Sequence, residues 1–185
     1  MERKLLVVLL IATFFIGACK DKKLPPAEWK RSTLSNLGLS VETPFVFKEK
    51  SIEDQLTPDV RKLVKEMHSF FEEQGENFYG ATAAEYTAEV TVSVEGAING
   101  AIQEMASKAK GTVENRKDEV KMINGNQANC TTATIARTDK DKMELQMVVL
   151  TKGQCIYQVM GLYRPDKDDV RKTAKRMIAS IELKP

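Results

Sequence analysis

The single histidine of the chain, His68, is the first residue to consider for catalysis. A Ser-His-Asp or Cys-His mechanism would have to use it, because imidazole is the base that activates the nucleophile in both. The motif G-x-S-x-G, which would present such a serine, does not occur. We therefore interpret His68 as a polar residue of a strand, with a catalytic or ligand role as the alternative.

Neighbouring carboxylates offer a second kind of chemistry, because two acids that flank a glycosidic bond can hydrolyse it. The candidate pairs are Glu72 with Glu73, Glu85 with Glu89, and Asp168 with Asp169. Acids also occupy exposed strand positions and first helical turns in most soluble proteins. That second interpretation suits these positions better, so we predict no catalytic residue.

Zinc, nucleotide and nucleic-acid binding lack the residues that they need. The chain has no C-x-x-C motif and no second histidine to complete a zinc site. It has no Walker A motif, and the glycines of segment 96–101 fall inside a predicted helix. Its 28 basic and 26 acidic side chains nearly balance, unlike those of a nucleic-acid-binding domain. We predict no metal, no cofactor and no nucleic-acid partner.

Cys130 and Cys155 lie in two predicted strands that flank a third, and an exported protein can oxidise such a pair. If the turns set the register, both cysteines lie opposite Leu150, one on each side. Two strand spacings, roughly 9 to 10 Å, then separate them. A disulfide needs Cα atoms within about 7 Å, so we predict two buried free thiols.

The N-terminus has the pattern of an export signal. Glu2, Arg3 and Lys4 precede an apolar run over residues 5–16. This run is too short to cross a hydrocarbon core of about 30 Å as a helix, and small residues follow it, as in a cleaved signal peptide.

The residues that end this run, Ile16-Gly17-Ala18-Cys19, resemble a bacterial lipobox. The resemblance implies that residues 1–18 are a lipoprotein signal peptide and that Cys19 is the lipid attachment site. An ordinary secreted protein with a cysteine near its cleavage site is the alternative. Two or more acyl chains would make attachment to the bilayer effectively permanent. Lys20, not aspartate, follows the cysteine, which in a Gram-negative cell favours the outer membrane, facing the periplasm.

Residues 19–28, charged and then proline-containing, are interpreted as the lipidated cysteine and a flexible tether. At about 3.3 Å per residue this segment reaches at most roughly 30 Å, enough to hold a domain just clear of the headgroups. No repeat or low-complexity segment interrupts residues 29–185, which we therefore expect to form a single α/β globular domain.

Three helices are predicted from caps and apolar spacing. A short one follows Thr57, a second runs from Ser93 to a glycine cap at Gly111, and a third follows Pro165 with Asp166 as its cap. The apolar stripes are Val60, Leu63, Val64 and Met67 in the first helix, Val94, Ala97, Ile98, Ala101, Ile102, Met105 and Ala109 in the second, and Val170, Ala174, Met177, Ile178 and Ile181 in the third.

Strands are predicted between these helices from alternating apolar residues and turn residues. They form an opening pair, a hairpin, a three-strand meander and a short strand at the C-terminus. The segments are 29–34 and 37–42, 67–73 and 78–87, 127–137, 143–151 and 154–163, and 180–183. Antiparallel strands with helices inserted between hairpins indicate a central sheet covered by helices.

The opening Trp29, followed by Leu-Gly-Leu-Ser-Val-Glu-Thr-Pro over residues 37–44, resembles the start of PsbP-like domains. The end of the chain is also similar, with Tyr157 and Tyr163 in the last meander strand and a closing helix that runs into residues 178–183. The resemblance implies an α+β fold in which an antiparallel β-sheet is sandwiched between helices, in three α/β/α layers. Members of that family mostly bind other macromolecules and share no catalytic site.

Four cations share one face of the third predicted helix, namely Arg171, Lys172, Lys175 and Arg176. They could dock an acidic partner or anionic lipid headgroups, although cations near a helix C-terminus also complement its dipole. We expect a membrane-anchored extracytoplasmic lipoprotein of the bacterial cell envelope that is not an enzyme and that binds or assembles with another envelope protein.

A carrier of a small apolar ligand, held in a pocket between sheet and helix, is the alternative function. Methionine side chains adapt to irregular ligands and could line such a pocket. The methionines considered for this role include Met105, Met143, Met147, Met160 and Met177.

Overall fold

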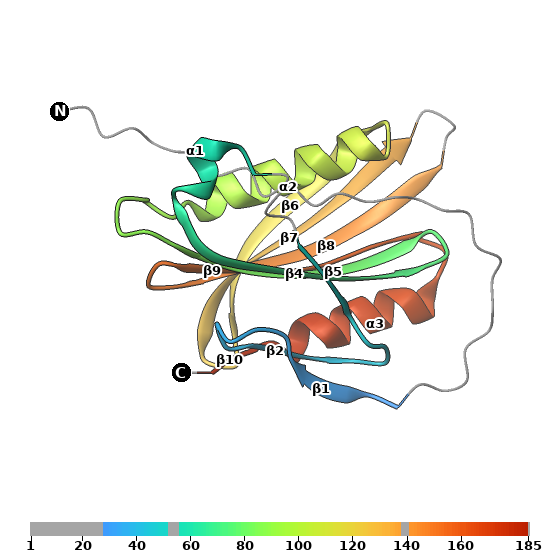
Figure 1. Cartoon of the computed structure of the whole chain (residues 1–185). Coiled ribbons are helices and arrows are strands. Elements are labelled where there is room, and N and C mark those ends of the chain that lie inside the picture. The colour runs from blue at the N-terminus through green and yellow to red at the C-terminus, as the bar shows by residue number, and fades with distance from the viewer. Residues whose placement is uncertain (1–27, 52–55, 138–140, 185) are drawn as a thin grey trace.

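Seven antiparallel strands form the central sheet of the computed structural model, which describes residues 28–51, 56–137 and 141–184 (Figure 1). Across the sheet they are β3 (Lys48–Lys50), β4 (Val64–Gln74), β5 (Asn77–Tyr86), β9 (Cys155–Tyr163), β8 (Lys142–Lys152), β7 (Asn126–Arg137) and β6 (Gly111–Ile123). A smaller sheet consists of β1 (Lys30–Thr33), β2 (Leu39–Thr43) and β10 (Glu182–Leu183). The helices are α1 (Pro58–Arg61), α2 (Val94–Lys108) and α3 (Asp168–Ala179).

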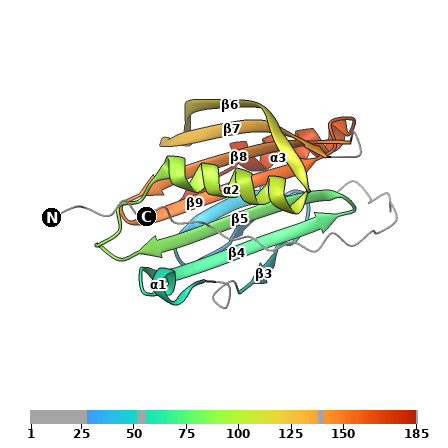
Figure 2. The ribbon, with the colours of Figure 1, turned by 90° about the horizontal axis from the view of Figure 1, so that it is seen from above.

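The central sheet lies between two other layers. Helix α2 covers one face, as the view from above shows (Figure 2), and α3 packs with the small sheet on the other face. A hydrophobic core lies on each face of the central sheet, and strand β8 contributes side chains to both. Met147 and Val149 point toward the α2 side, whereas Val148 and Leu150 point toward the α3 side. The predicted fold class, an antiparallel sheet between helices, is confirmed. No helix in the described part of the chain is long and apolar enough to cross a membrane.

The predicted hairpin, meander, opening pair and C-terminal strand are all present. The hairpin is β4 and β5, and the meander is β7, β8 and β9 in adjacent positions. The C-terminal strand β10 does not join the meander but pairs with β2, with Leu183 opposite Leu39. This pairing closes the small sheet over α3.

Helix α1 is shorter than its apolar spacing suggests. Thr57 caps it as predicted, with its hydroxyl accepting a backbone hydrogen bond at 3.4 Å. The helix has only four residues, however, and Val64 and Met67 lie on β4. A β-bulge between Val64 and Glu66 shifts the strand alternation, so that both apolar side chains reach the α2 side of the sheet. The bulge thus places apolar residues three positions apart on one face of a strand, a spacing that is typical of a helix.

Helix α2 begins where predicted, because the Ser93 hydroxyl accepts a hydrogen bond from the Gly96 backbone N–H at 3.0 Å. The predicted cap at Gly111 is wrong: the helix ends at Lys108 with Ala109 as its C-cap residue, and Gly111 is the first residue of β6. A Cβ atom at Gly111 would lie 2.6 Å from the carbonyl oxygen of Ala136. Glycine is therefore needed for the close approach of β6 to β7.

Helix α3 buries Val170, Ala174 and Met177, as its stripe predicts. The predicted cap at Asp166 is wrong, because the helix starts from Lys167 without a side-chain cap. The two acids of its first turn face the positive end of the helix dipole instead.

Cys130 and Cys155 are free thiols, as predicted, but the predicted register is wrong. Cys130 lies opposite Val148 and Cys155 opposite Lys152, so neither lies opposite Leu150. The β8–β9 turn begins one residue later than expected, at a glycine with a φ of 61°, and this shifts Cys155 by two positions. Four positions along β8 and two strand spacings put the cysteines on the order of 16 Å apart. Both are half-buried rather than buried.

Candidate functional site

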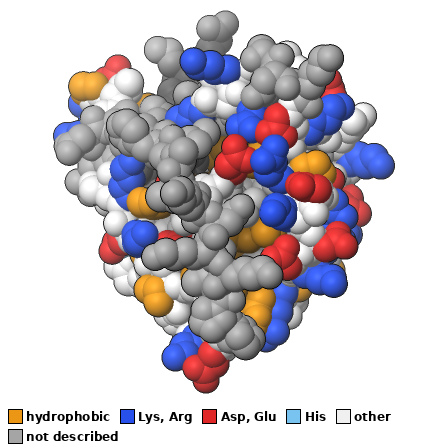
Figure 3. Space-filling view, turned by 90° about the vertical axis from the view of Figure 1, so that its right-hand side faces the viewer, with side chains coloured by type: hydrophobic (Ala, Val, Ile, Leu, Met, Phe, Trp, Pro, Cys, Tyr) orange, Lys and Arg blue, Asp and Glu red, His pale blue; other side chains and the backbone are white. Residues whose placement is uncertain are grey.

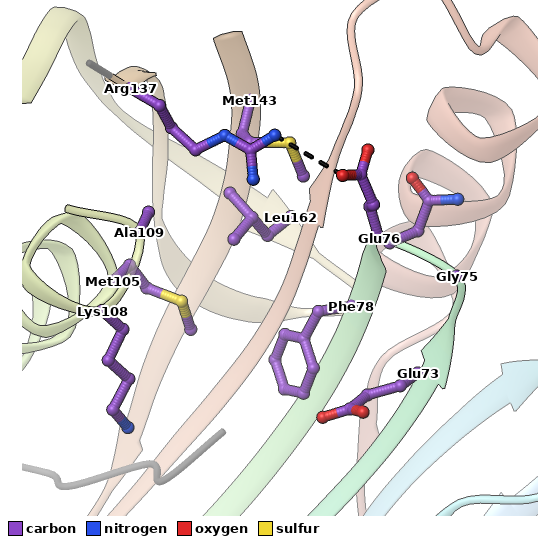
Figure 4. Close-up of a pocket in the computed structure, with 11 residues that line it drawn as sticks. Glu73, Gly75, Glu76, Phe78, Met105, Lys108, Ala109, Arg137, Met143 and Leu162 are labelled. Atoms are coloured by element: carbon purple, nitrogen blue, oxygen red, sulfur yellow. Dashed lines mark ion pairs between the residues drawn. The ribbon is translucent and has the colours of Figure 1, made fainter. Parts of the chain in front are cut away.

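A pocket opens where helix α2 ends beside the β4–β5 turn (Figure 4). Its lining is mostly apolar and is surrounded by charged side chains from several elements. The apolar lining residues are Phe78, Met105, Ala109, Met143 and Leu162, and the charged ones are Glu73, Glu76, Lys108 and Arg137. Figure 3 views the side of the molecule from which the β4–β5 turn projects in Figure 1, and acidic and basic side chains there surround small hydrophobic areas.

Two glycines shape this pocket. Gly75 has a φ of 64°, a conformation that glycine adopts without strain, and it forms the β4–β5 turn. Gly80 leaves room for the aromatic ring of Phe78, because a Cβ atom at Gly80 would lie 2.8 Å from that ring. Phe78 can therefore lie along its own strand and form one wall of the pocket.

Ion pairs tie the elements around the pocket together. Arg137 at the end of β7 binds Asp141 and reaches Glu76 at 3.6 Å. Arg164, which follows β9, binds Glu76 at 2.9 Å and Asp141 at 3.0 Å. The hydrogen bond from Arg137, and then that from Arg164, hold the pKa of Asp141 below its usual value. The turn and three strand ends are thus fixed relative to one another.

The pocket is small. Its volume is about 50 Å³, whereas pockets for drug-sized ligands hold about 300 Å³ or more. An apolar lining of this size suits one aliphatic or aromatic side chain, with acids and cations beside it to bind the flanking polar groups. Its chemistry is therefore that of an anchor site for a partner's side chain.

The five methionines considered for a carrier do not line one cavity. Met105 and Met143 line the pocket, but Met147 and Met160 lie in the packed core between α2 and the sheet. Met177 belongs to the core on the opposite face. Four of the five are less than 5% exposed and the fifth is fully buried, as expected for packing residues.

His68 lies on β4 between two carboxylates. Its Nδ1 is 2.9 Å from Glu49 and its Nε2 is 2.7 Å from Glu66. Carboxylates only accept hydrogen bonds, so the doubly protonated imidazolium satisfies both contacts. Burial by itself lowers the pKa of His68, but the hydrogen bonds and charges of Glu49 and Glu66 outweigh it and raise the pKa above 6.5.

One acid of each predicted pair is engaged with a cation. Glu72 pairs with Lys48 at 3.4 Å, Glu85 with Lys65 at 2.7 Å, and Asp168 with Arg171 at 3.4 Å. These are cross-strand and helical ion pairs of solvated faces. Over residues 28–51, 56–137 and 141–184, no cluster of three or more His, Cys, Asp or Glu could hold a metal ion.

Helix α3 carries the four predicted cations, but they divide into two kinds. Arg171 binds both carboxylate oxygens of Glu144 on β8, each at 3.2 Å. Arg176 lies over the ring of Trp29 at 4.1 Å and pairs with Glu42 at 3.4 Å. Lys172 and Lys175 are exposed between these contacts. The arginines thus connect α3 to the two sheets, and the lysines form the solvent-facing part of the patch.

Sequence reasoning missed the pocket and its ion pairs. Only the opposite charges of Arg137 and Asp141, which flank the predicted turn between two meander strands, could have indicated one of these ion pairs. Glu76 and Arg164 come from turns far apart in the sequence. The predicted lipid attachment site, Cys19, lies outside the described residues.

No protein-family model and no curated protein matches the sequence. The fold does have solved counterparts. The solution structure of cyanobacterial PsbP (CyanoP) from Synechocystis sp. PCC 6803 superposes with a TM-score of 0.57 at 12% identity, over 91% of this chain and 99% of that one. The chain therefore has a PsbP-like fold.

Two bacterial proteins share less of the structure. One from Bacteroides thetaiotaomicron VPI-5482 gives a TM-score of 0.47 at 11% identity, over 84% of this chain and 48% of that one. The Pseudomonas aeruginosa protein PA94, described as a putative regulator of unknown function, gives a TM-score of 0.41 at 12% identity, over 86% of this chain and 99% of that one.

Proposed function

We propose that this chain is a lipid-anchored extracytoplasmic protein that acts as a non-catalytic binding or assembly module for another component of the bacterial cell envelope. The observation that supports binding most directly is the pocket beside the β4–β5 turn, with its apolar lining and fixed charged surroundings. A partner segment with one apolar side chain between polar residues would fit it. The lipobox-like sequence before Cys19 supports the anchor and the location.

The state of His68 supports a non-catalytic role. A general base needs a free lone pair on the imidazole, and both ring nitrogens of His68 contact carboxylates instead. With the metal-binding and nucleophile motifs missing from the sequence, the described surface offers binding groups rather than reacting groups.

Crosslinking in intact cells tests the proposal. A tagged wild-type chain should capture one envelope protein reproducibly, and Ala109→Phe, which fills the pocket with a benzyl group, should lose it. Ala179→Phe is the matched control, because this alanine ends α3 on the exposed surface away from the pocket. Equal capture by all three chains would remove the pocket as the docking site, and capture of only abundant bystanders would contradict the binding function.

The patch on α3 needs a separate variant. Reversing Lys172 and Lys175 to glutamate changes the exposed charge while leaving the contacts of Arg171 and Arg176 in place. Loss of the partner in this variant would assign docking to α3.

A carrier of a small apolar ligand is the second candidate, favoured by the apolar lining that Phe78, Met105 and Met143 give the pocket. The small volume of the pocket favours a site for a partner's side chain instead. Native mass spectrometry of the delipidated chain separates the two, because a carrier should retain an added mass that Ala109→Phe abolishes.

A further inference from the structure

Strand β6 presents an open sheet edge. It is the outermost strand of the central sheet, and among the described strands it pairs with β7 alone (Figure 2). Its side chains are exposed throughout residues 117–122, including Val120 at 61% and Met122 at 67%. An open edge of this kind is a template for a further strand.

The edge is held in a defined shape. A β-bulge between Glu114 and Lys117 ends the irregular part of β6, leaving residues 117–123 in continuous register with β7. At the tip of the hairpin, the Asn124 side-chain amide donates to the carbonyl oxygen of Ile181 at 2.8 Å. The regular half of β6 is therefore held in register with β7, and the hairpin tip that follows it is fixed to the chain near β10.

The two faces of this segment differ. Glu119 lies opposite Cys130, and Lys121 lies opposite Ala128, which both contact the α3-side core. Directly opposed residues share a face, so the charged residues at odd positions lie on the α3 side. Val120 and Met122 then lie together on the α2 side.

We propose that β6 pairs antiparallel with β6 of a second copy of this chain, about a two-fold axis at Val120. In a two-fold pairing the central residue lies opposite its own copy. A register centred on Lys117, Asp118, Glu119 or Lys121 would therefore oppose like charges, which destabilises a sheet. A register centred on Met122 would pair only residues 121–123 within the strand.

The register centred on Val120 pairs all of residues 117–123. It places Glu119 opposite Lys121 of the second copy, and Lys121 opposite Glu119 of the second copy. These opposite charges lie on the α3 side. On the α2 side the two Val120 side chains face each other, and Met122 of each copy lies opposite Asp118 of the other. The charge order of the strand is thus complementary to itself in this one register.

The dimer should be weak, because seven paired residues bury much less than the roughly 1,200 Å² of a stable interface. Sedimentation equilibrium of the chain from residue 19 onward, carrying Cys19→Ser, should show monomer and dimer in a concentration-dependent balance. Glu119→Lys and Lys121→Glu, each alone, should weaken dimerisation about tenfold or more, since each creates two like-charge contacts. The double variant Glu119→Lys/Lys121→Glu should restore it.

Crosslinking checks the register independently. Val120→Cys places two thiols directly opposite each other and should form a disulfide dimer under mild oxidation. Val113→Cys, on the same strand before the bulge, is the control and should not. A chain that is monomeric at all concentrations, or a dimer that ignores both charge reversals, would overturn the proposal.

Discussion

His68 shows how a single residue can link several parts of the fold. Its two carboxylate partners lie on β3 and β4, and Glu66 also accepts a hydrogen bond from Asn36, in the β1–β2 turn, at 2.6 Å. The imidazolium therefore links the edge strand β3 to β4, and Glu66 extends this link to the β1–β2 turn. This contribution depends on its charge and hence on pH.

Because the pKa of His68 is raised in the folded chain, its stabilisation is present below about pH 6.5 and is lost as pH rises through the raised value. His68→Gln should lower the free energy of unfolding by about 1 kcal/mol at pH 6 and by much less at pH 9. Urea unfolding of both chains at the two pH values measures this difference. An equal effect at both would show that the charge of His68 contributes nothing.

The two thiols lead to a second prediction at this scale. Alkylation of the unfolded, unreduced chain should label both Cys130 and Cys155, as mass spectrometry of tryptic peptides would show. In the folded chain Cys130 should react slowly, because burial raises the pKa of its thiol. Recovery of a peptide pair linked through both cysteines would contradict the strand order.

At the scale of elements, helix α3 depends on a glycine in β9. A Cβ atom at Gly161 would lie 2.9 Å from the Cβ of Ala174, so the helix sits directly on the strand backbone. Gly161→Val should cost about 1 to 3 kcal/mol of unfolding free energy, because the helix must move away. Urea unfolding measures this, with Ala179→Val on the exposed surface as the control, and an unchanged midpoint would contradict this packing.

The ion pairs beside the pocket give an acid-dependent prediction. The pKa of Asp141 is lowered, so its stabilisation is present above its usual pKa of 3.8 and is lost as pH falls through the folded value. Asp141→Asn should lower the unfolding free energy by about 1 kcal/mol at pH 7. Unfolding curves of the two chains should converge toward pH 2.5, and a constant gap down to that pH would rule out this origin.

For the whole molecule, the proposed anchor gives a prediction. The wild-type chain should be found in the membrane fraction of its host, and Cys19→Ala should release it to the soluble extracytoplasmic fraction. Metabolic labelling with a fatty acid should mark only the wild type. A labelled Cys19→Ala chain, or one that stays with the membrane, would contradict attachment through Cys19.

Much of the fold could be predicted because its signals are local. Turn residues and alternating apolar positions identified β4, β5, β7, β8 and β9, and the Ser93 cap identified the start of α2. Strand β6 was not predicted, because it is exposed on both faces over most of its length and so has no apolar alternation. The bulge in β4 had the opposite effect and imitated a helix.

The sequence by itself determined the α+β class, the strand-rich order of elements and the candidate anchor at Cys19, since caps, turns and apolar runs act over a few residues. Only the tertiary structure decided the pocket, the two-sided contacts of His68 and the open edge of β6. Glu76 and Arg164 meet because β5 begins beside the end of β9, with Phe78 opposite Leu162. Such contacts depend on register and on which elements become neighbours, and no short stretch of sequence contains that information.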